Sequence, residues 1–363
     1  AQVNSATVSG SKLVGNRATA SSASGGAEAD GGGIYASAGQ TTVTSTRISG
    51  TWLSAQGATG GAADGGGIFN GGGPLSVTSS SITTGTVHAE SGGGNASAGC
   101  GGIHQTANAH LSLVRSSVDR NQVSAGAGSM DAQAGGGGVC AAGSASVLSS
   151  TVSRNTLLAT TADGLARSRG GGLLLTSQSD QGAITNSTVA GNVVTAKETG
   201  SGTMKSFGGG IDTFLSPLVL TDATVAANKV AGTGTPGFPL SGGGVFVDGT
   251  GTVGPAATIL ALNTAHGVGA DCFGKVVSDG HNLIQKPSGF CNLTEKPNDK
   301  INVDPKLGLL QHNGGPTETM AIGATSPALD AIPKAACAVA KDQRGVPRPQ
   351  GPSCDIGAYE RKI

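Results

Sequence analysis

Clusters of two to four glycines followed by one aliphatic residue recur along the first two thirds of the chain. The aliphatic residues are Ile34, Ile68, Ile103, Val139, Leu173, Ile211 and Val245, and successive copies lie 34, 35, 36, 34, 38 and 34 residues apart. A fixed period of this length is typical of a solenoid, whose repeats bury their apolar edges by stacking on their neighbours. The pattern predicts about seven coils of about 35 residues each.

The segments between these clusters favour strands over helices. The stretch from Leu75 to Ile82, for example, is short and rich in Val, Thr and Ser, and glycine clusters interrupt such stretches every few residues. A repeat of this kind holds three short strands, a corner, and an arm of Gly, Ala and Ser. We therefore predict an all-β fold, a single-stranded right-handed parallel β-helix with long Gly/Ala/Ser-rich arms. The right hand follows from the preference of parallel crossover connections.

A second motif keeps the same period and reads Ser or Thr, then Val, then Asn three residues later. Its asparagines are Asn121, Asn155, Asn192 and Asn228, and Asn263 continues the series. Stacked asparagines can bond to one another through their side-chain amides and satisfy backbone groups at a corner that no sheet reaches. We expect an asparagine ladder, and we expect the glycines to allow positive φ or a close approach of neighbouring coils.

Charge density changes along the chain and marks a boundary. Residues 1–250 hold 23 charged residues, whereas the much shorter segment 251–363 holds 21. The repeats themselves continue to Asn263. We therefore expect a parallel β-helix over residues 1–263 and a C-terminal segment over 264–363 that packs on the helix or caps it.

Four of the six cysteines form two close pairs in the C-terminal segment, Cys272 with Cys291 and Cys337 with Cys354. Neither pair has the spacing of a zinc site, so two disulfides in an oxidising compartment are expected. The predicted cap therefore contains disulfides. Cys100 and Cys140 remain, and a third disulfide between them is one alternative.

The repeated Gly-Gly-Gly-Ile and Ser-x-Val-x-x-Asn motifs resemble the β-helical repeats of polymorphic outer-membrane proteins and related bacterial surface proteins. The C-terminal third holds, in order, the motifs His281–Ile284, Asp304–Gly308, Asn313–Thr319, Ser326–Asp330, Asp342–Pro349 and Cys354–Glu360. Together they resemble the choice-of-anchor Q domain of bacterial exported β-helix proteins. The resemblance covers essentially the whole chain and implies an extracellular or cell-surface protein, but it assigns no reaction and no catalytic residue. An anchor commonly follows the last motif in that family, whereas this chain ends three residues after Glu360, so we expect a released protein.

Composition limits the expected partners. The net charge is zero, from 22 basic and 22 acidic residues, and no run of Lys and Arg resembles a phosphate-binding stripe. Nucleic acid is therefore not an expected partner. The longest apolar stretch, residues 256–262, is far shorter than the roughly 20 residues that cross a bilayer, so we expect no membrane span.

Acidic residues on the arms are the first candidates for a site. Asp30 and Asp64 each precede a glycine triplet and lie 34 residues apart, in the same phase of the repeat. Their carboxylates are expected about 5 Å apart on neighbouring coils. Two stacked carboxylates repel unless a cation, a shared proton or water lies between them. A calcium ion bound by both is one interpretation, and two solvated acids are the other.

The residues that directly follow the aliphatic anchors are expected to form an outward-pointing column. Its members are Tyr35, Phe69, His104, Cys140, Leu174, Asp212 and Phe246. His104 and Cys140 become neighbours in this column. They could hold a metal ion or act as a nucleophilic pair, whereas Cys140 could instead form a disulfide with Cys100.

Parallel β-helices often carry polysaccharide lyases and hydrolases, so an enzyme has to be considered. Asp131, Asp163, Arg167 and Arg169 are the best cluster of acids and cations for such a reaction. Aromatic residues make up only 3% of the chain, and cations on the arms are sparse. The glycine-rich arms are also expected to be too flexible to hold catalytic groups.

We therefore expect a secreted or cell-surface, non-catalytic protein that is adhesin-like or structural in an extracellular matrix. Its partner would be an extracellular polysaccharide, a host or matrix surface, or another copy of the chain. The alternative is a polysaccharide lyase or glycoside hydrolase that uses the acids and arginines of the arms. A further alternative, ice binding, rests on the aligned Thr151, Thr188 and Thr224.

Overall fold

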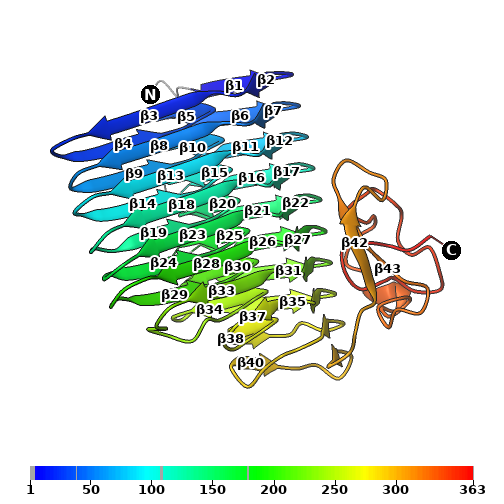
Figure 1. Cartoon of the computed structure of the whole chain (residues 1–363). Coiled ribbons are helices and arrows are strands. Elements are labelled where there is room, and N and C mark those ends of the chain that lie inside the picture. The colour runs from blue at the N-terminus through cyan, green and yellow to red at the C-terminus, as the bar shows by residue number, and fades with distance from the viewer. Residues whose placement is uncertain (1–4, 38, 107–108, 178–179, 363) are drawn as a thin grey trace.

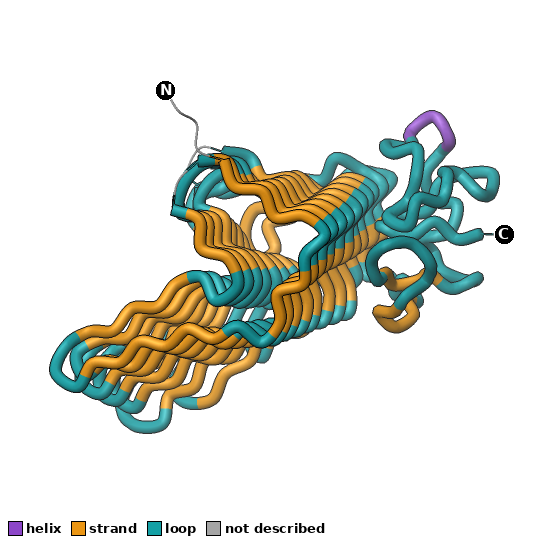
Figure 2. Tube along the Cα trace, turned by 90° about the horizontal axis from the view of Figure 1, so that it is seen from above, coloured by secondary structure: helices purple, strands orange, loops and turns teal. Residues whose placement is uncertain are grey.

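The chain folds as a right-handed parallel β-solenoid of about seven turns, as the repeat predicts. The computed structural model describes residues 5–37, 39–106, 109–177 and 180–362. Seen along the stack, each full coil has a closed body and an arm that projects from one of its corners (Figure 2). Body strands form three rows along the stack, and arm strands form an outgoing and a returning row (Figure 1).

The three body rows enclose the main core. The first row contains β5 (Ile34–Ala36), β10 (Ile68–Asn70), β15 (Ile103–Gln105), β20 (Val139–Ala141), β25 (Leu173–Leu175), β30 (Ile211–Phe214) and β34 (Val245–Asp248). The second row contains β1 (Ser5–Ser9), β6 (Gln40–Thr44), β11 (Leu75–Thr78), β16 (Leu111–Val114), β21 (Ala145–Leu148), β26 (Gly182–Thr185), β31 (Pro217–Thr221) and β35 (Thr252–Ala256). The third row contains β2 (Lys12–Val14), β7 (Arg47–Ser49), β12 (Ser81–Thr83), β17 (Ser117–Asp119), β22 (Thr151–Ser153), β27 (Thr188–Ala190), β32 (Thr224–Ala226), β36 (Ile259–Ala261), β39 (Leu283–Ile284) and β41 (Lys300–Ile301).

Each arm is a pair of strands that belong to two parallel sheets. The outgoing row contains β3 (Arg17–Ser22), β8 (Trp52–Gly57), β13 (Thr86–Ser91), β18 (Gln122–Ala127), β23 (Thr156–Thr161), β28 (Val193–Glu198), β33 (Lys229–Thr233) and β37 (Thr264–Ala265). The returning row contains β4 (Gly26–Asp30), β9 (Gly60–Asp64), β14 (Asn95–Gly99), β19 (Ala132–Gly135), β24 (Leu165–Arg169) and β29 (Thr203–Phe207).

The aliphatic anchors of the repeat lie inside the body, as predicted. The anchors from Ile68 to Val245 are completely buried, and Ile34, in the first complete coil, is partly buried against the same core. Parallel strand pairing brings each anchor directly over the next, for example Ile103 over Val139. Stacking therefore buries a continuous column of aliphatic side chains, which is the main source of stability in a solenoid.

The asparagine ladder is confirmed. The side-chain amide of Asn121 donates to the Oδ1 of Asn155 at 3.0 Å, and the same bond joins Asn155 to Asn192 at 2.9 Å. The series continues through Asn228 to Asn263. All five side chains are buried at the corner where the body meets the arm, so the ladder supplies hydrogen bonds that the strands there cannot provide.

The prediction that the arms are flexible is wrong. Their outgoing and returning sheets pack face to face on a second hydrophobic core, separate from that of the body. Most of its residues are alanines, such as Ala89, Ala98 and Ala125, and each is almost completely buried. Small side chains at every second position let the two sheets approach closely, so the arms form an ordered two-layered wall (Figure 2).

The parallel stack continues beyond the boundary expected at residue 263. Strand β38 (Cys272–Val277) pairs with the body strands β34 and β35, and β40 (Cys291–Thr294) pairs with β38. These last coils lack long arms. The disulfide Cys272–Cys291 joins β38 and β40, as expected from the cysteine spacing.

The segment after the last coil packs on the third body row (Figure 1). It contains the antiparallel pair β42 (Leu307–Gln311) and β43 (Thr319–Ile322), the short 3₁₀ helix η1 (Lys334–Ala336), and the expected disulfide Cys337–Cys354. Gln343 donates to the Oγ1 of Thr151 and accepts from the Oγ1 of Thr188, and Ala358 donates its N–H to Thr224. These threonines are buried, so they cannot form an exposed ice-binding face.

Within the described residues, no helix is both long enough and apolar enough to span a bilayer.

Candidate functional site

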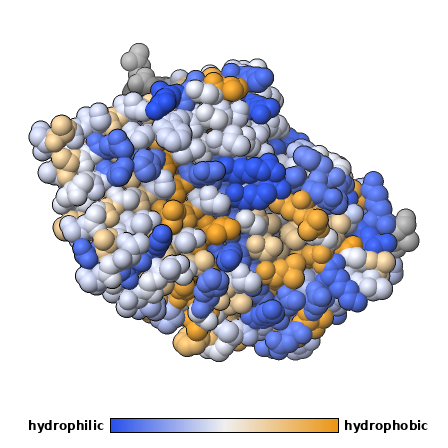
Figure 3. All heavy atoms as spheres, viewed as in Figure 1, coloured by the Kyte–Doolittle hydropathy of each residue, from blue (hydrophilic) through white to orange (hydrophobic). Residues whose placement is uncertain are grey.

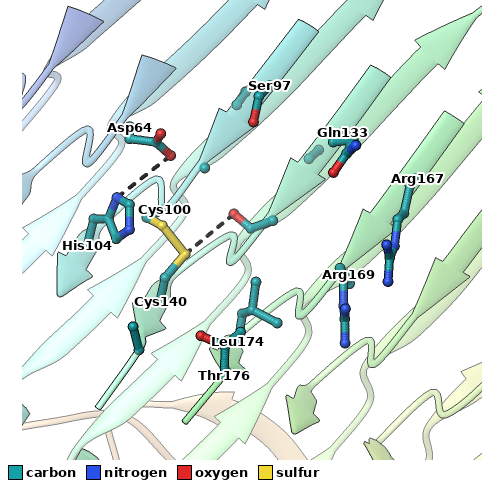
Figure 4. A pocket seen from close by; sticks show the side chains of 15 residues that line it. Asp64, Ser97, Cys100, His104, Gln133, Cys140, Arg167, Arg169, Leu174 and Thr176 are labelled. Carbon is teal, nitrogen blue, oxygen red and sulfur yellow. Dashed lines mark hydrogen bonds and ion pairs between the residues drawn. A yellow bond between two sulfur atoms is a disulfide. The ribbon is translucent and has the colours of Figure 1, made fainter. Parts of the chain in front are cut away.

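A cleft of about 270 Å³ lies between the returning arm row and the first body row. Ser97, Gln133 and Arg167 line it from the arm, and His104 and Leu174 line it from the body (Figure 4). On the molecular surface, hydrophobic residues gather in a band along the junction of arm and body (Figure 3). We call this cleft, together with the surface that continues it between the two rows, the arm groove.

Two glycines line the cleft of the arm groove. Strand pairing aligns Asp64, Gly99, Gly135 and Arg169 on four successive coils of the returning row. The charged residues thus stand at the two ends, whereas the middle positions carry no side chain. A Cβ atom on Gly99 would lie 2.2 Å from the carboxylate of Asp64, so even alanine would disturb this wall.

The column that follows the anchors forms the body side of the groove. Tyr35, Phe69, His104, Cys140 and Leu174 pair in register on successive first-row strands, as predicted. The Tyr35 and Phe69 rings stack with centroids 5.1 Å apart, and Tyr35 is 57% exposed. An exposed aromatic surface therefore lies at the N-terminal end of the groove.

The column does not stay open along its whole length. Asp212 and Phe246, which were expected to point outward into solvent, are buried. Arg169 covers Asp212, and the Phe207 ring of the arm stacks on Phe246 with a centroid distance of 4.6 Å. The arm and the body thus meet in these coils and close the C-terminal end of the groove.

The N-terminal end of the groove is acidic. Asp30 and Asp64 pair in register on neighbouring strands, as predicted from their spacing. Burial, with a further contribution from the charges of Asp30 and Glu28, raises the pKa of Asp64 to about 7. Burial lowers the pKa of His104 to about 4, so this imidazole is neutral at pH 7. Its Nδ1 lies 3.7 Å from the Oδ1 of Asp64, and the contact is therefore not a salt bridge at neutral pH.

The pKa of Asp64 predicts a pH-dependent stability. The unfolded chain loses this proton near pH 3.8 and the folded protein near pH 7, so the free energy of unfolding falls as the pH rises through this window. The full shift corresponds to about 4 kcal/mol, and solvent screening reduces it because the Asp64 side chain is 28% exposed. We therefore expect Asp64→Asn to raise the free energy of unfolding by about 2 kcal/mol at pH 8 and to leave it unchanged near pH 3.5. Urea unfolding at both pH values measures this difference. Asp279→Asn, at an exposed position, is the control, and an equal gain in both variants would contradict the prediction.

A third disulfide joins Cys100 to Cys140. Neither sulfur is then a thiolate, so the nucleophilic pair of His104 and Cys140 and the metal site that used the Cys140 thiolate are both wrong. Ligand atoms of Asp64, Cys100 and His104 lie within 4.8 Å of one another, but only the Asp64 carboxylate and the His104 imidazole keep the chemistry of a metal ligand. A calcium ion at Asp30 and Asp64 stays a prediction.

The C-terminal end of the groove is cationic. The Nε and Nη2 of Arg169 donate to the two carboxylate oxygens of Asp212 at 2.8 and 2.9 Å, and its guanidinium lies over the Phe214 ring. Arg167 lines the cleft two residues nearer the arm tip, and it pairs in register with Gln133 on one side and Lys205 on the other. The two arginines therefore differ, because Arg169 pairs directly with a carboxylate, whereas the Nε of Arg167 makes no hydrogen bond with any described residue.

The structure does not bring the four candidate lyase residues together. Asp131 and Asp163 lie at the tips of the arms, away from the cleft. The carboxylate of Asp131 accepts from the N–H of Leu165, and that of Asp163 accepts from the N–H and hydroxyl of Ser201. Both acids thus join the turns of neighbouring coils. The sequence analysis did not identify Ser97 and Gln133 as groove residues, although they occupy the same position of the repeat as Arg167.

Comparisons with protein-family models, with curated proteins and with solved structures found no match.

Proposed function

We propose that this protein is an extracellular, non-catalytic carbohydrate-binding solenoid that holds an extended polysaccharide in its arm groove. The observation that carries this proposal is the exposed stack of Tyr35 on Phe69, which adjoins the cleft through His104; polar side chains form part of the lining of that cleft. Flat aromatic faces pack well on the apolar faces of sugar rings, and a few convergent polar groups then select the hydroxyl pattern. Such binding suits an adhesin-like or matrix protein.

Two features support the extracellular location. The three disulfides are typical of proteins that fold in an oxidising compartment. The resemblance of the C-terminal motifs to the choice-of-anchor Q domain favours a bacterial exported protein. A stiff stack with an ordered arm wall then presents its groove along its length to a cell wall, a matrix or a host surface.

A glycoside hydrolase is the second candidate, because a carboxyl with a pKa of about 7 faces the groove beside another acid. Asp64 in this state could act as a general acid. Glycosidases place two carboxyl groups on either side of the scissile bond. Asp30 and Asp64 instead lie on one face of one sheet, and the facing column in those coils carries Tyr35, Phe69 and His104. Binding without cleavage therefore fits this geometry better.

We expect Tyr35→Ala to weaken polysaccharide binding about tenfold, because it removes the outer ring of the stack. Affinity electrophoresis against a panel of neutral and acidic polysaccharides, followed by calorimetry with the best ligand, measures the loss. Trp52→Ala is the matched control, since Trp52 is also an exposed aromatic residue but lies on the outgoing arm sheet, outside the groove.

The same samples test the alternative. Absence of binding to every polysaccharide in the panel would contradict the proposed function. Release of new reducing ends by the wild type, abolished in Asp64→Asn and kept in Asp131→Asn, would replace it with hydrolysis.

A further inference from the structure

We infer that Arg167 binds a carboxylate of the polysaccharide, so that the ligand of the arm groove is an acidic glycan built from uronic acids. This inference rests on the proposed function and names the class of its ligand. It follows from the bonding of Arg167, from the charge around it and from the space in front of it.

Arg167 carries a buried donor without an acceptor. Its Nε makes no hydrogen bond with any residue that the structure describes. A guanidinium is charged at any physiological pH, and a buried charged donor that lacks an acceptor is costly. Arg167 is also half-buried in the wall of the cleft, so few water molecules can reach its Nε–H and accept a hydrogen bond from it. A ligand that brings an acceptor would remove this cost.

Arg169, two residues later on the same strand, shows what Arg167 lacks. Its Nε and one terminal nitrogen donate hydrogen bonds to the two oxygens of the Asp212 carboxylate. This fork geometry matches a planar carboxylate and is among the strongest side-chain pairings. Arg167 lies two residues further out along the arm and lines the cleft, and no described carboxylate forms such a fork with it. A ligand carboxylate bound in the cleft would pair with Arg167 as Asp212 pairs with Arg169.

The charge around Arg167 also favours an anion. The charges of Asp212 and Asp248 act on Arg167 and Arg169, which balances two cations with two carboxylates. Lys205 pairs in register with Arg167 on the next coil and adds one positive charge. Burial is the main cause that lowers the pKa of Arg167, and the charge of Arg169 adds to it. One anionic group bound beside Arg167 and Lys205 would make the site neutral.

The space and the neighbouring groups fit a sugar chain. Gly99 and Gly135 line the cleft beside Arg167, and Ser97 and Gln133 continue the line of Arg167 toward the aromatic stack. Successive coils are about 4.8 Å apart. A polysaccharide that runs along the stack would place one sugar on Tyr35 and Phe69 and an acidic sugar, about three to four coils further on, at Arg167.

The binding test compares uronic acid oligomers with the same oligomers as methyl esters. We expect Arg167→Gln to weaken binding of the acid form about tenfold or more and to leave the weaker binding of the ester unchanged. Arg47→Gln is the control, because it removes one positive charge from the third body row, away from the groove. Equal affinity of wild type and Arg167→Gln for the acid form would overturn the inference while the Tyr35→Ala result still supports the proposed function.

A second measurement does not depend on polymer binding. The side-chain Nε–H resonance of Arg167, assigned by its loss in Arg167→Gln, is followed by NMR in the full chain while a monomeric uronate or inorganic sulfate is added. We expect a saturable shift with the uronate and a weaker one with sulfate. No shift with the uronate, or tighter binding of sulfate, would overturn the carboxylate site even if no polysaccharide binds and the proposed function fails.

Discussion

Replacing Asn155 by alanine is expected to lower the free energy of unfolding by about 4 kcal/mol. The Oδ1 of Asn155 accepts from the backbone N–H and the side-chain amide of Asn121, both at 3.0 Å. Its Nδ2 donates to the carbonyl of Val118 at 3.1 Å and to the Oδ1 of Asn192 at 2.9 Å. Alanine would break all four bonds at a fully buried site.

The size of this effect comes from the groups left behind. The backbone N–H of Asn121 and one hydrogen of its side-chain amide lose their acceptor and stay buried after the substitution, and each unsatisfied group costs about 1–3 kcal/mol. Urea unfolding followed by circular dichroism measures the loss. Asn95→Ala is the control, because the exposed Asn95 accepts a single bond from the N–H of Asp131. A loss below about 1 kcal/mol for Asn155→Ala would show that the ladder is not the interaction that holds this corner.

Replacing Gly102 by alanine is expected to lower the free energy of unfolding by about 3 kcal/mol. A Cβ atom at this position would lie 2.4 Å from Cγ1 of Val118 and 2.6 Å from the carbonyl oxygen of Gly138. The oxygen belongs to the backbone of the next coil and accepts the N–H of Ile103, so it cannot move without opening the stack. The overlap would therefore force two coils apart.

Gly60→Ala is the matched control for this substitution. Gly60 lies in the returning arm row, and its Cβ would meet its nearest atom, the carbonyl oxygen of Asn95, at an ordinary 3.7 Å. Alanine restricts the unfolded chain, so this variant is expected to keep or slightly increase stability. Thermal unfolding of the two variants gives the comparison. Similar midpoints would mean that close backbone approach is not the reason for the repeated glycines.

The repeat shows how much of such a fold can be predicted from sequence. A solenoid coil contacts only its neighbours, so residues one period apart become neighbours in space. This is why Ile103 over Val139, Asn121 beside Asn155 and Asp30 beside Asp64 could be predicted without the structure. The disulfide partners Cys272 and Cys291, which lie on neighbouring coils, were predicted instead from their close spacing in the sequence.

The arms show where sequence reasoning failed. Their glycine and alanine content indicated flexibility, because small residues bury little surface one at a time. Alternating alanines, such as Ala96 and Ala98, instead face the outgoing sheet and close a core between the two arm layers. The alternation was visible in the sequence, but its meaning depended on a second sheet at the right distance.

The sequence alone determined the coil, its period and the column that each residue occupies, because these depend on contacts between equivalent positions of adjacent repeats. Only the tertiary structure decided which columns face one another. The returning arm folds back beside the first body row, so Gly99, Gly135 and Arg167 meet His104 and Leu174 across a cleft. The same packing separates Asp131 from Arg167 and pairs Arg169 with Asp212. Contacts of this kind join residues at different positions of the repeat. The repeat length predicts only which equivalent positions stack on one another, so it cannot predict these contacts.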